Sequence, residues 1–144
     1  MKRLGITVLL IFGLVTSAFA GKTVNVRRLT DWEGTTMTDY ALINGNEITT
    51  ESVKFNGAVG FASLLVTGTG DVDIDMELSA DGTNFYDPYT TDGTTCDSVT
   101  SVMDSVTTDR WLVLTARLAP YIRFKIDPDA ASTMTFTIIY QEEY

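Results

Sequence analysis

Acidic side chains are the residues whose spacing along this chain is most suggestive of chemistry. Asp71, Asp73, Asp75 and Glu77 alternate with apolar residues. If this run is a β-strand, side chains two positions apart lie on one face, about 7 Å from each other. Four like charges on one face indicate a cation site or a patch for a basic partner. The alternative is a solvated face, balanced by the two bases that alternate in the same way in residues 121–126.

A second set of carboxylates lies in predicted turns and suggests a calcium site. Calcium takes six to eight oxygen ligands, and loop carbonyls supply some of them. Aspartate is also a common turn former, so the alternative is that these residues only shape the loops. Calcium is therefore the one candidate cofactor, and its candidate ligands are Asp81, Asp87, Asp92 and Asp97.

An aromatic set in the same region suggests a glycan contact. Tyr86 and Tyr89 flank Asp87, and Asn84 precedes them. Aromatic rings stack on the apolar face of a sugar, while carboxylate and amide groups hydrogen-bond its hydroxyls. Trp32, between two acids, is expected to be exposed and to join this contact or to fix the first loop. The alternative is that the tyrosines only cover one end of the fold.

Three further residues are given structural roles. Phe85, which follows an Asp-Gly turn, and Trp111, which begins an apolar Trp-Leu-Val-Leu run, are expected in the core. Cys96 is the only cysteine, which excludes an intrachain disulfide and any CxxC metal cluster. We expect its thiol to be inert, and pairing with a second chain is the alternative.

Composition excludes several classes of function. The 144-residue chain has no histidine, so Ser-His-Asp triads and histidine-based zinc sites are excluded. Its formal net charge of -9 argues against nucleic acid and anionic membrane surfaces, which must be met by lysine and arginine. A carboxylate pair could hydrolyse glycosides, but a domain this short leaves little chain for a cleft. We therefore predict a non-catalytic protein.

Residues 1–20 are predicted to be a secretory signal peptide. Lys2 and Arg3 precede an apolar stretch, and Ala18-Phe19-Ala20 supplies a small-x-small cleavage pattern. The apolar run is shorter than the ~20 residues of a membrane-spanning helix. Cleavage removes two bases and changes the formal net charge from -9 to -11. We expect an exported protein, periplasmic, on the cell surface or extracellular, with residues 21–144 as a single domain.

Period-two alternation of apolar and polar residues recurs after residue 20 and predicts an all-β domain. Glycine-containing turns such as Asn44-Gly45-Asn46 separate the alternating runs. About eight short strands at this spacing favour an antiparallel, two-sheet, jelly-roll-like β-sandwich. The predicted strands are Thr23 to Leu29, Glu47 to Phe55, Val59 to Thr67, Asp71 to Ser79, Ser98 to Met103, Arg110 to Ala116, Tyr121 to Ile126 and Thr133 to Tyr140.

Two segments carry a resemblance to a known family. The run Met76-Glu77-Leu78-Ser79-Ala80-Asp81-Gly82-Thr83-Asn84-Phe85 is followed later by Ala119-Pro120-Tyr121-Ile122-Arg123-Phe124. Residues 71–144 thereby resemble discoidin-like, galactose-binding-like β-sandwich modules, which also occur in phage and bacterial surface proteins. The second segment departs from the family at Pro120, where an arginine is usual. The resemblance implies the fold but transfers no binding residue, because ligand contacts in that family lie on variable end loops.

These observations leave three functional hypotheses. The first is a structural or assembly subunit that contacts other protein chains, including copies of itself, through threonine-rich faces (Thr133, Thr135, Thr137) and the acidic stripe. The second is a carbohydrate-binding module that uses the end-loop aromatics. The third is a small outer-membrane β-barrel, although Glu142 and Glu143 interrupt the apolar side of the last strand. Nucleic-acid binding and membrane insertion of the mature chain are not expected.

Overall fold

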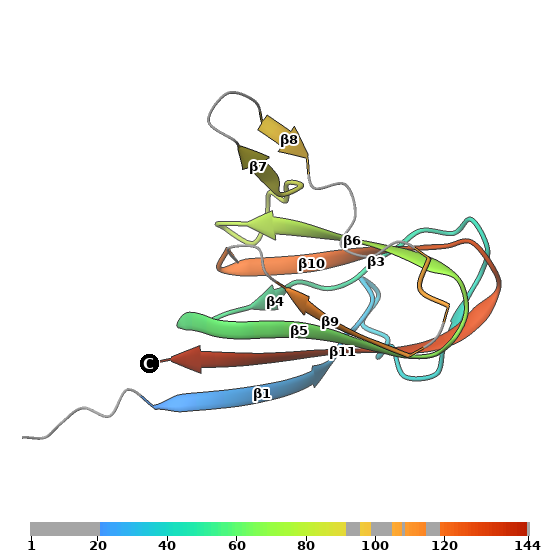
Figure 1. Cartoon of the computed structure of the whole chain (residues 1–144), viewed down its shortest axis with the longest axis horizontal. Coiled ribbons are helices and arrows are strands. Elements are labelled where there is room, and N and C mark those ends of the chain that lie inside the picture. The colour runs from blue at the N-terminus through green and yellow to red at the C-terminus, as the bar shows by residue number, and fades with distance from the viewer. Residues whose placement is uncertain (1–20, 92–95, 99–104, 108, 115–118, 144) are drawn as a thin grey trace, which may run out of the picture.

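The protein is built from two antiparallel β-sheets that pack face to face (Figure 1). The computed structural model describes residues 21–91, 96–98, 105–107, 109–114 and 119–143. The five-stranded sheet contains β1 (Lys22–Arg28), β2 (Tyr40–Leu42), β5 (Ala58–Thr69), β9 (Arg110–Leu114) and β11 (Ser132–Glu143). The four-stranded sheet contains β3 (Ile48–Thr49), β4 (Val53–Lys54), β6 (Val72–Ser79) and β10 (Tyr121–Pro128). A separate hairpin pairs β7 (Tyr89–Thr91) with β8 (Cys96–Ser98).

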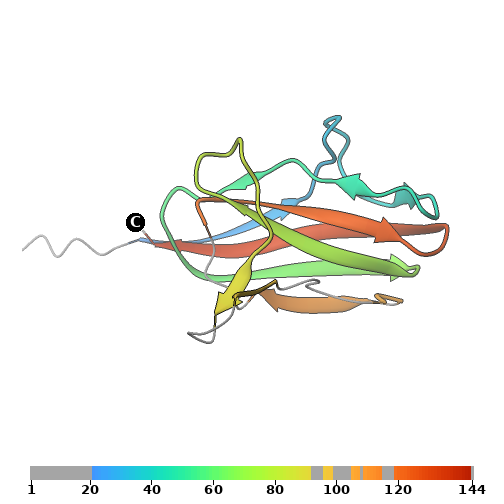
Figure 2. The same cartoon turned by 90° about the horizontal axis from the view of Figure 1, so that it is seen from above.

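The prediction of an all-β antiparallel sandwich is confirmed, with nine strands in the two sheets. In the five-stranded sheet, β11 pairs with β5 on one side and with β1 and then β2 on the other. β10 has the same role in the four-stranded sheet, with β6 on one side and the short strands β3 and β4 on the other. Seen from above, β6 and β10 lie over the five-stranded sheet (Figure 2).

Two of the chain crossings between the sheets lie at the same end of the sandwich, on the right in Figure 1. The first connects β5 to β6, and the second connects β10 to β11. The Asp129 N–H donates to the Asp71 carbonyl at 2.8 Å, so the two crossings are bonded to each other. Gly68 has a φ of +118°, a backbone conformation that residues with an L side chain rarely adopt. A Cβ at this position would lie 2.5 Å from the Thr133 carbonyl oxygen.

The space between the sheets is filled by the apolar side chains of alternating positions. Phe124 and Ile126 from β10 and Phe136 and Ile138 from β11 are fully buried, as the period-two pattern predicted. Burial of each such side chain stabilises the fold by roughly 1.5–3 kcal/mol. At the end of this core, the buried Glu142 carboxylate accepts the backbone N–H of Asn56 at 2.6 Å and the side-chain amide of Asn25 at 3.2 Å.

A loop of residues 30–36 closes one open side of the sandwich. It leaves the edge of the five-stranded sheet after β1 and reaches the edge of the four-stranded sheet. There the Trp32 N–H donates to the Thr49 carbonyl at 3.1 Å, and the Glu51 N–H donates to the Thr30 carbonyl at 2.7 Å. The buried Asp31 carboxylate accepts the N–H of Thr35 at 2.7 Å. This loop is therefore fixed at both of its ends and from within.

The structure corrects four details of the sequence-based strands and core. The predicted strand 47–55 is divided into β3 and β4, because Thr49 faces Lys125 and Val53 faces Ile122, which leaves three residues of this segment opposite two of β10. β2 and β7, three residues each, were not predicted. Trp111 was expected in the core but is 57% exposed, since it points to the outer face of β9. Phe85 was also expected in the core, but it lies half-buried outside it against Arg123.

Several predictions fall outside the described residues or are only partly covered. The predicted signal peptide, residues 1–20, and Asp92 lie outside them. Of the predicted strand 98–103, only Ser98 is described, within β8. Within the described ranges there is no helix with the length and apolar character needed to cross a membrane.

Candidate functional site

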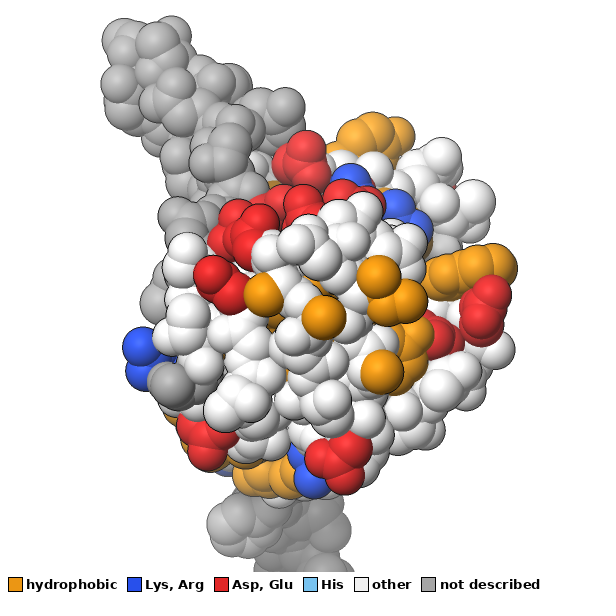
Figure 3. Space-filling view, turned by 90° about the vertical axis from the view of Figure 1, so that its right-hand side faces the viewer, with side chains coloured by type: hydrophobic (Ala, Val, Ile, Leu, Met, Phe, Trp, Pro, Cys, Tyr) orange, Lys and Arg blue, Asp and Glu red, His pale blue; other side chains and the backbone are white. Residues whose placement is uncertain are grey.

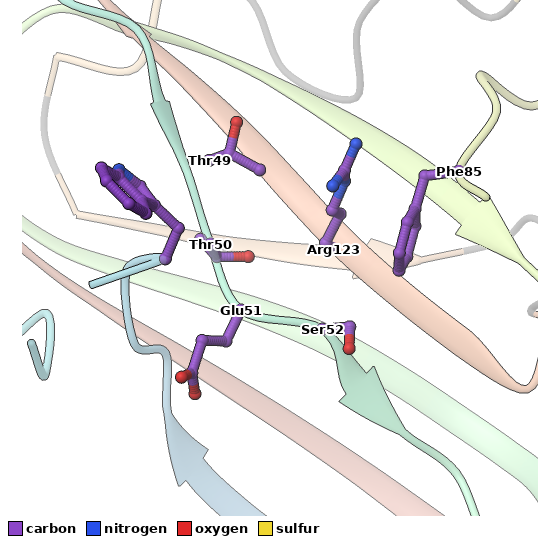
Figure 4. A pocket seen from close by; sticks show the side chains of 7 residues that line it. Thr49, Thr50, Glu51, Ser52, Phe85 and Arg123 are labelled. Carbon is purple, nitrogen blue, oxygen red and sulfur yellow. The ribbon is translucent and has the colours of Figure 1, made fainter. Parts of the chain in front are cut away.

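A groove on the outer face of the four-stranded sheet is the main candidate site (Figure 4). Its volume of about 410 Å³ lies within the roughly 300–1,000 Å³ range of small-molecule sites. We call it the Trp32–Phe85 groove, after the aromatic residues that line it. Its lining residues are Trp32, Thr49, Thr50, Glu51, Ser52, Phe85 and Arg123.

The Trp32 side of the groove is an exposed indole on a fixed loop. Trp32 is 70% exposed, although the loop that carries it is bonded to both sheets. Asp31 holds this loop by accepting hydrogen bonds from the Thr35 and Glu33 N–H groups and from the Tyr40 hydroxyl at 2.7 Å. Burial acts to raise the pKa of Asp31, but these hydrogen bonds outweigh it, and the pKa lies below its usual range. The same hydrogen bond raises the pKa of Tyr40 to about 12.

The Phe85 side of the groove follows a turn that is closed by its own side chains. The Asp81 carboxylate accepts the N–H groups of Thr83 and Asn84 at 2.8 and 2.9 Å and the side-chain amide of Asn84 at 2.9 Å. These hydrogen bonds hold the pKa of Asp81 well below its usual range. Residue 86 then pairs with Leu78 of β6 through two backbone hydrogen bonds. Phe85 is thereby fixed between an ordered turn and a sheet.

Arg123, which lines the groove, belongs to a partly buried ion-pair network. The Arg123 Nε donates to Glu77 at 2.5 Å, and the Lys125 Nζ donates to the same carboxylate at 3.0 Å. Burial acts to raise the pKa of Glu77, but the bonds from both bases lower it below its usual range. The Arg123 guanidinium also lies 4.1 Å from the centre of the Phe85 ring, and the two side chains lie next to each other in Figure 4. Arg123 is therefore held on two sides.

The acidic stripe lies on the same outer face, and β10 supplies bases beside part of it. In the register of β6 and β10, Glu77 faces Arg123 and Asp75 faces Lys125. Asp73, however, faces Asp127, so the far end of the stripe has no base opposite. Bases therefore balance the half of the stripe that contains Asp75 and Glu77, and not the half that contains Asp73.

The unbalanced half of the stripe continues into an acidic cluster at the end of the sandwich where the chain crosses between sheets. Acidic side chains gather there on the side of the four-stranded sheet (Figure 3). Burial and the charges of Asp73, Asp71 and Asp127 raise the pKa of Asp129. Burial and the nearby Asp87 carboxylate likewise raise the pKa of Asp75. Among the described residues, no group of three or more potential ligands is arranged to hold a metal ion.

The predicted calcium and glycan ligands are not brought together as a single set. Asp81 is occupied by its own turn, Asp87 is exposed, and Asp97 is described only as part of the backbone of β8. Of the glycan residues, Asn84 is bonded to Asp81, and Tyr86 is 67% exposed next to the turn. Trp32 lies in the groove instead of with Tyr86. Tyr89 belongs to β7, where its backbone alone is described.

A second surface, on the outer face of the five-stranded sheet, is apolar. The strand registers place Val26, Ile139, Ser63 and Val113 in one row across β1, β11, β5 and β9. Trp111 stands opposite Leu65 in the next row. We call this surface the apolar face, and its large side chains are 41–68% exposed. They are Val24, Val26, Phe61, Trp111 and Val113.

The threonines expected to form this outer face are partly covered. Thr133 is exposed, but Thr135 and Thr137 are buried. The Thr135 hydroxyl accepts the Asp39 N–H at 2.8 Å, and Thr137 bonds to the Arg28 guanidinium. The chain that runs along the edge of the sheet therefore covers these two hydroxyls, and apolar side chains form the open part of the face.

Comparison with known proteins adds no assignment to either surface. No family model, no curated protein and no solved structure matches this chain. The resemblance to discoidin-like modules stays a prediction. Sequence reasoning named Trp32 as a contact but missed Phe85 and Arg123 as its companions. The signal for Arg123 was its outward position in an alternating strand, but nothing in the sequence places Trp32 beside it.

Proposed function

We propose that this is an exported, non-catalytic protein that assembles with a second copy of itself through the apolar face. The observation that carries the proposal is the set of five large apolar side chains on one sheet face, which are 41–68% exposed. Soluble monomers rarely expose contiguous apolar patches beyond a few hundred Å², and larger patches mark contact surfaces. Two members of the set, Phe61 and Trp111, are aromatic, and aromatic residues are enriched at contacts between proteins.

Charge favours a second copy as the partner on this face. The chain carries a formal net charge of -9, so most approaches between two copies are repulsive. On the apolar face, however, Lys22 and Glu143 form an ion pair at 2.8 Å, and Arg28 adds one positive charge. The Glu143 carboxylate on this face is thus paired with a base of its own chain when two copies meet. A two-fold, self-complementary contact is also the commonest symmetry of soluble oligomers.

The edge of the same sheet is a less suitable contact. Among the described strands, β1 pairs only with β11, so its outer edge is open. Yet Lys22, Arg27 and Arg28 all lie on this strand, and basic side chains on an edge oppose pairing with the same edge of another copy. Association through the face is therefore favoured over extension of the sheet.

Oligomeric state tests the proposal directly. Light scattering on the purified protein should show a dimer that dissociates on dilution. Trp111→Lys and Val26→Lys should each weaken the dimer at least about tenfold, because they place a charge in the desolvated contact. Both side chains are exposed, so the free energy of unfolding of the monomer should change by less than about 0.5 kcal/mol.

Ile43→Lys is the matched control. Ile43 is 65% exposed, but it lies in the turn after β2, away from the apolar face. This variant should dimerise like the original protein. A protein that is monomeric at every concentration, or face variants that dimerise normally, would contradict the proposal.

A further inference from the structure

The Trp32–Phe85 groove has aromatic walls whose backbone is held in place by hydrogen bonds. Trp32 is exposed, but hydrogen bonds within and beyond its loop fix the backbone on both sides of it. Phe85 is held by the Arg123 guanidinium and by the paired backbone of the residue that follows it. Binding to side chains on a fixed backbone costs less conformational entropy than binding to a mobile loop. An exposed indole on a rigid support therefore points to a ligand with a flat apolar face.

The floor between these aromatics is polar. Thr49 and Ser52 are half-buried and line the groove with hydroxyl groups, which both donate and accept hydrogen bonds. Glu51 is exposed and lies 3.8 Å from Arg27, too loose a pair to occupy its carboxylate. Arg123 uses its Nε–H for Glu77, and a guanidinium has five N–H donors in all. Donors and acceptors are thus interspersed along one short groove.

The charges of the groove favour a neutral ligand. An anion would meet Glu51 in a chain that is already strongly acidic. A cation would meet Arg123 in the floor and Lys125 beside it. A neutral ligand with many hydroxyl groups meets neither penalty. It can also use the carboxylate and the guanidinium as strong hydrogen-bonding partners.

From these three features we infer that the Trp32–Phe85 groove binds a neutral saccharide unit of a glycan. A sugar ring has an apolar C–H face that stacks on an indole and a rim of hydroxyls that suits the floor. The site lies on the face of the four-stranded sheet, not at the end loop of Tyr86. It also lies on the opposite side of the sandwich from the apolar face, so it does not depend on self-assembly.

Tryptophan fluorescence tests this site, because the chain has two tryptophans and one lies in the groove. In a Trp111→Phe background, emission reports Trp32 alone. The probes are neutral hexasaccharides of glucose, xylose, mannose and N-acetylglucosamine, with hexagalacturonate and hexaglucosamine as charged counterparts. We expect at least one neutral probe to shift the emission and to bind more tightly than either charged probe.

Two variants locate the binding, measured by calorimetry in the original background. Trp32→Ala should weaken binding by about tenfold or more, as expected for the loss of a stacked ring. Tyr86→Ala removes a comparably exposed aromatic from the end loop and should change affinity by less than about twofold. Unfolding midpoints of both variants should match the original protein. The inference is overturned if no neutral probe binds, if a charged probe binds more tightly, or if Tyr86→Ala rather than Trp32→Ala removes binding.

Discussion

Two carboxylates, Asp31 and Asp75, differ in how the folded protein treats their negative charge. Asp31 is 3% exposed, but Tyr40 and two backbone N–H groups donate to it. Its pKa is lowered, so its contribution to stability is present above its unfolded pKa and is lost as the pH falls through the folded value. Asp75 is half-buried, and one of its oxygens is buried without a hydrogen-bond partner among the described residues.

Asp75 is therefore expected to lower stability at neutral pH. Burial, Asp87 and Asp73 raise its pKa, and Lys125 offsets them only in part. A raised folded pKa means that stability is fully present below the unfolded value of 3.8 and is lost as the pH rises through the folded pKa. Asp75→Asn should thus raise the free energy of unfolding at pH 7 by about 0.5–1 kcal/mol. In urea titrations the gain should disappear near pH 3, where the Asp75 carboxyl is neutral in both the folded and the unfolded protein.

Asp73→Asn is the control for this prediction. Asp73 lies on the same strand and the same stripe, but its carboxylate accepts the Ser105 N–H at 2.8 Å. Its replacement should bring no gain at pH 7. Equal stabilisation by both variants would show that general repulsion along the stripe, and not the local environment of Asp75, sets the effect.

At the scale of elements, the β5–β6 and β10–β11 crossings depend on close backbone contact. A Cβ added at Gly68 would lie 2.5 Å from the Thr133 carbonyl oxygen, and the φ of +118° is unfavourable for any L side chain. Because the obstacle is backbone, it cannot move aside without distorting the β5–β11 ladder. Gly68→Ala should therefore reduce the free energy of unfolding by at least about 2 kcal/mol in urea titrations.

Gly60→Ala separates this effect from the general effect of replacing glycine by alanine in a strand. Gly60 lies on the same strand without a positive φ, and its added Cβ would meet the flexible end of Gln141 at 3.1 Å. We expect a change of less than about 1 kcal/mol. A similar loss in both variants would mean that the Gly68 contact is not the cause.

The strands with strict alternation could be predicted from sequence, and those without it could not. β6, β10 and β11 each place most of their apolar residues on one side, so burial on a single face determines both strand and direction. Around Trp111 the run is apolar at successive positions, so alternation does not tell which side chains face inward. The inward residues proved to be Leu112 and Leu114, and Trp111 and Val113 form part of the apolar face.

The groove was harder to predict because its walls are distant in sequence. Trp32 lines the same groove as Arg123 because residues 30–36 leave one sheet and bond to the edge of the other. Phe85 turns outward because the Asp81 turn folds over the sheet, where Gly82 lies against the Tyr121 ring. Neither the position of Trp32 nor that of Phe85 is marked by a periodic pattern in the sequence. Residue types alone therefore suggested stacking aromatics but could not place Trp32 in one groove with Phe85 and Arg123.

At the scale of the whole molecule, the two outer faces of the sandwich have different character. The four-stranded sheet carries the acidic stripe, the ion-pair network and the groove. The five-stranded sheet carries the apolar face, with one ion pair at its border. This separation would let one molecule associate through one face and bind a ligand on the other. It also means that the acidic surfaces of two associated copies face away from each other.

The salt dependence of dimerisation follows from this arrangement. The two copies repel each other through their net negative charge, whereas the proposed contact itself is apolar. Added NaCl shortens the screening length from about 30 Å at 0.01 M to about 8 Å at 0.15 M and so reduces the repulsion. The dimer dissociation constant, measured by sedimentation, should therefore fall several-fold over this range, while Trp111→Lys stays monomeric.

The opposite salt dependence would identify a different contact. The basic edge strand β1 and the acidic stripe on β6 are complementary in charge, and a head-to-tail contact between them would be held by ion pairs. Such a contact would weaken as salt is added, and it would also continue into open chains instead of closing as a dimer. Dimers strengthened by salt in sedimentation would exclude this charge-complementary contact, because screening weakens an association that is held by ion pairs.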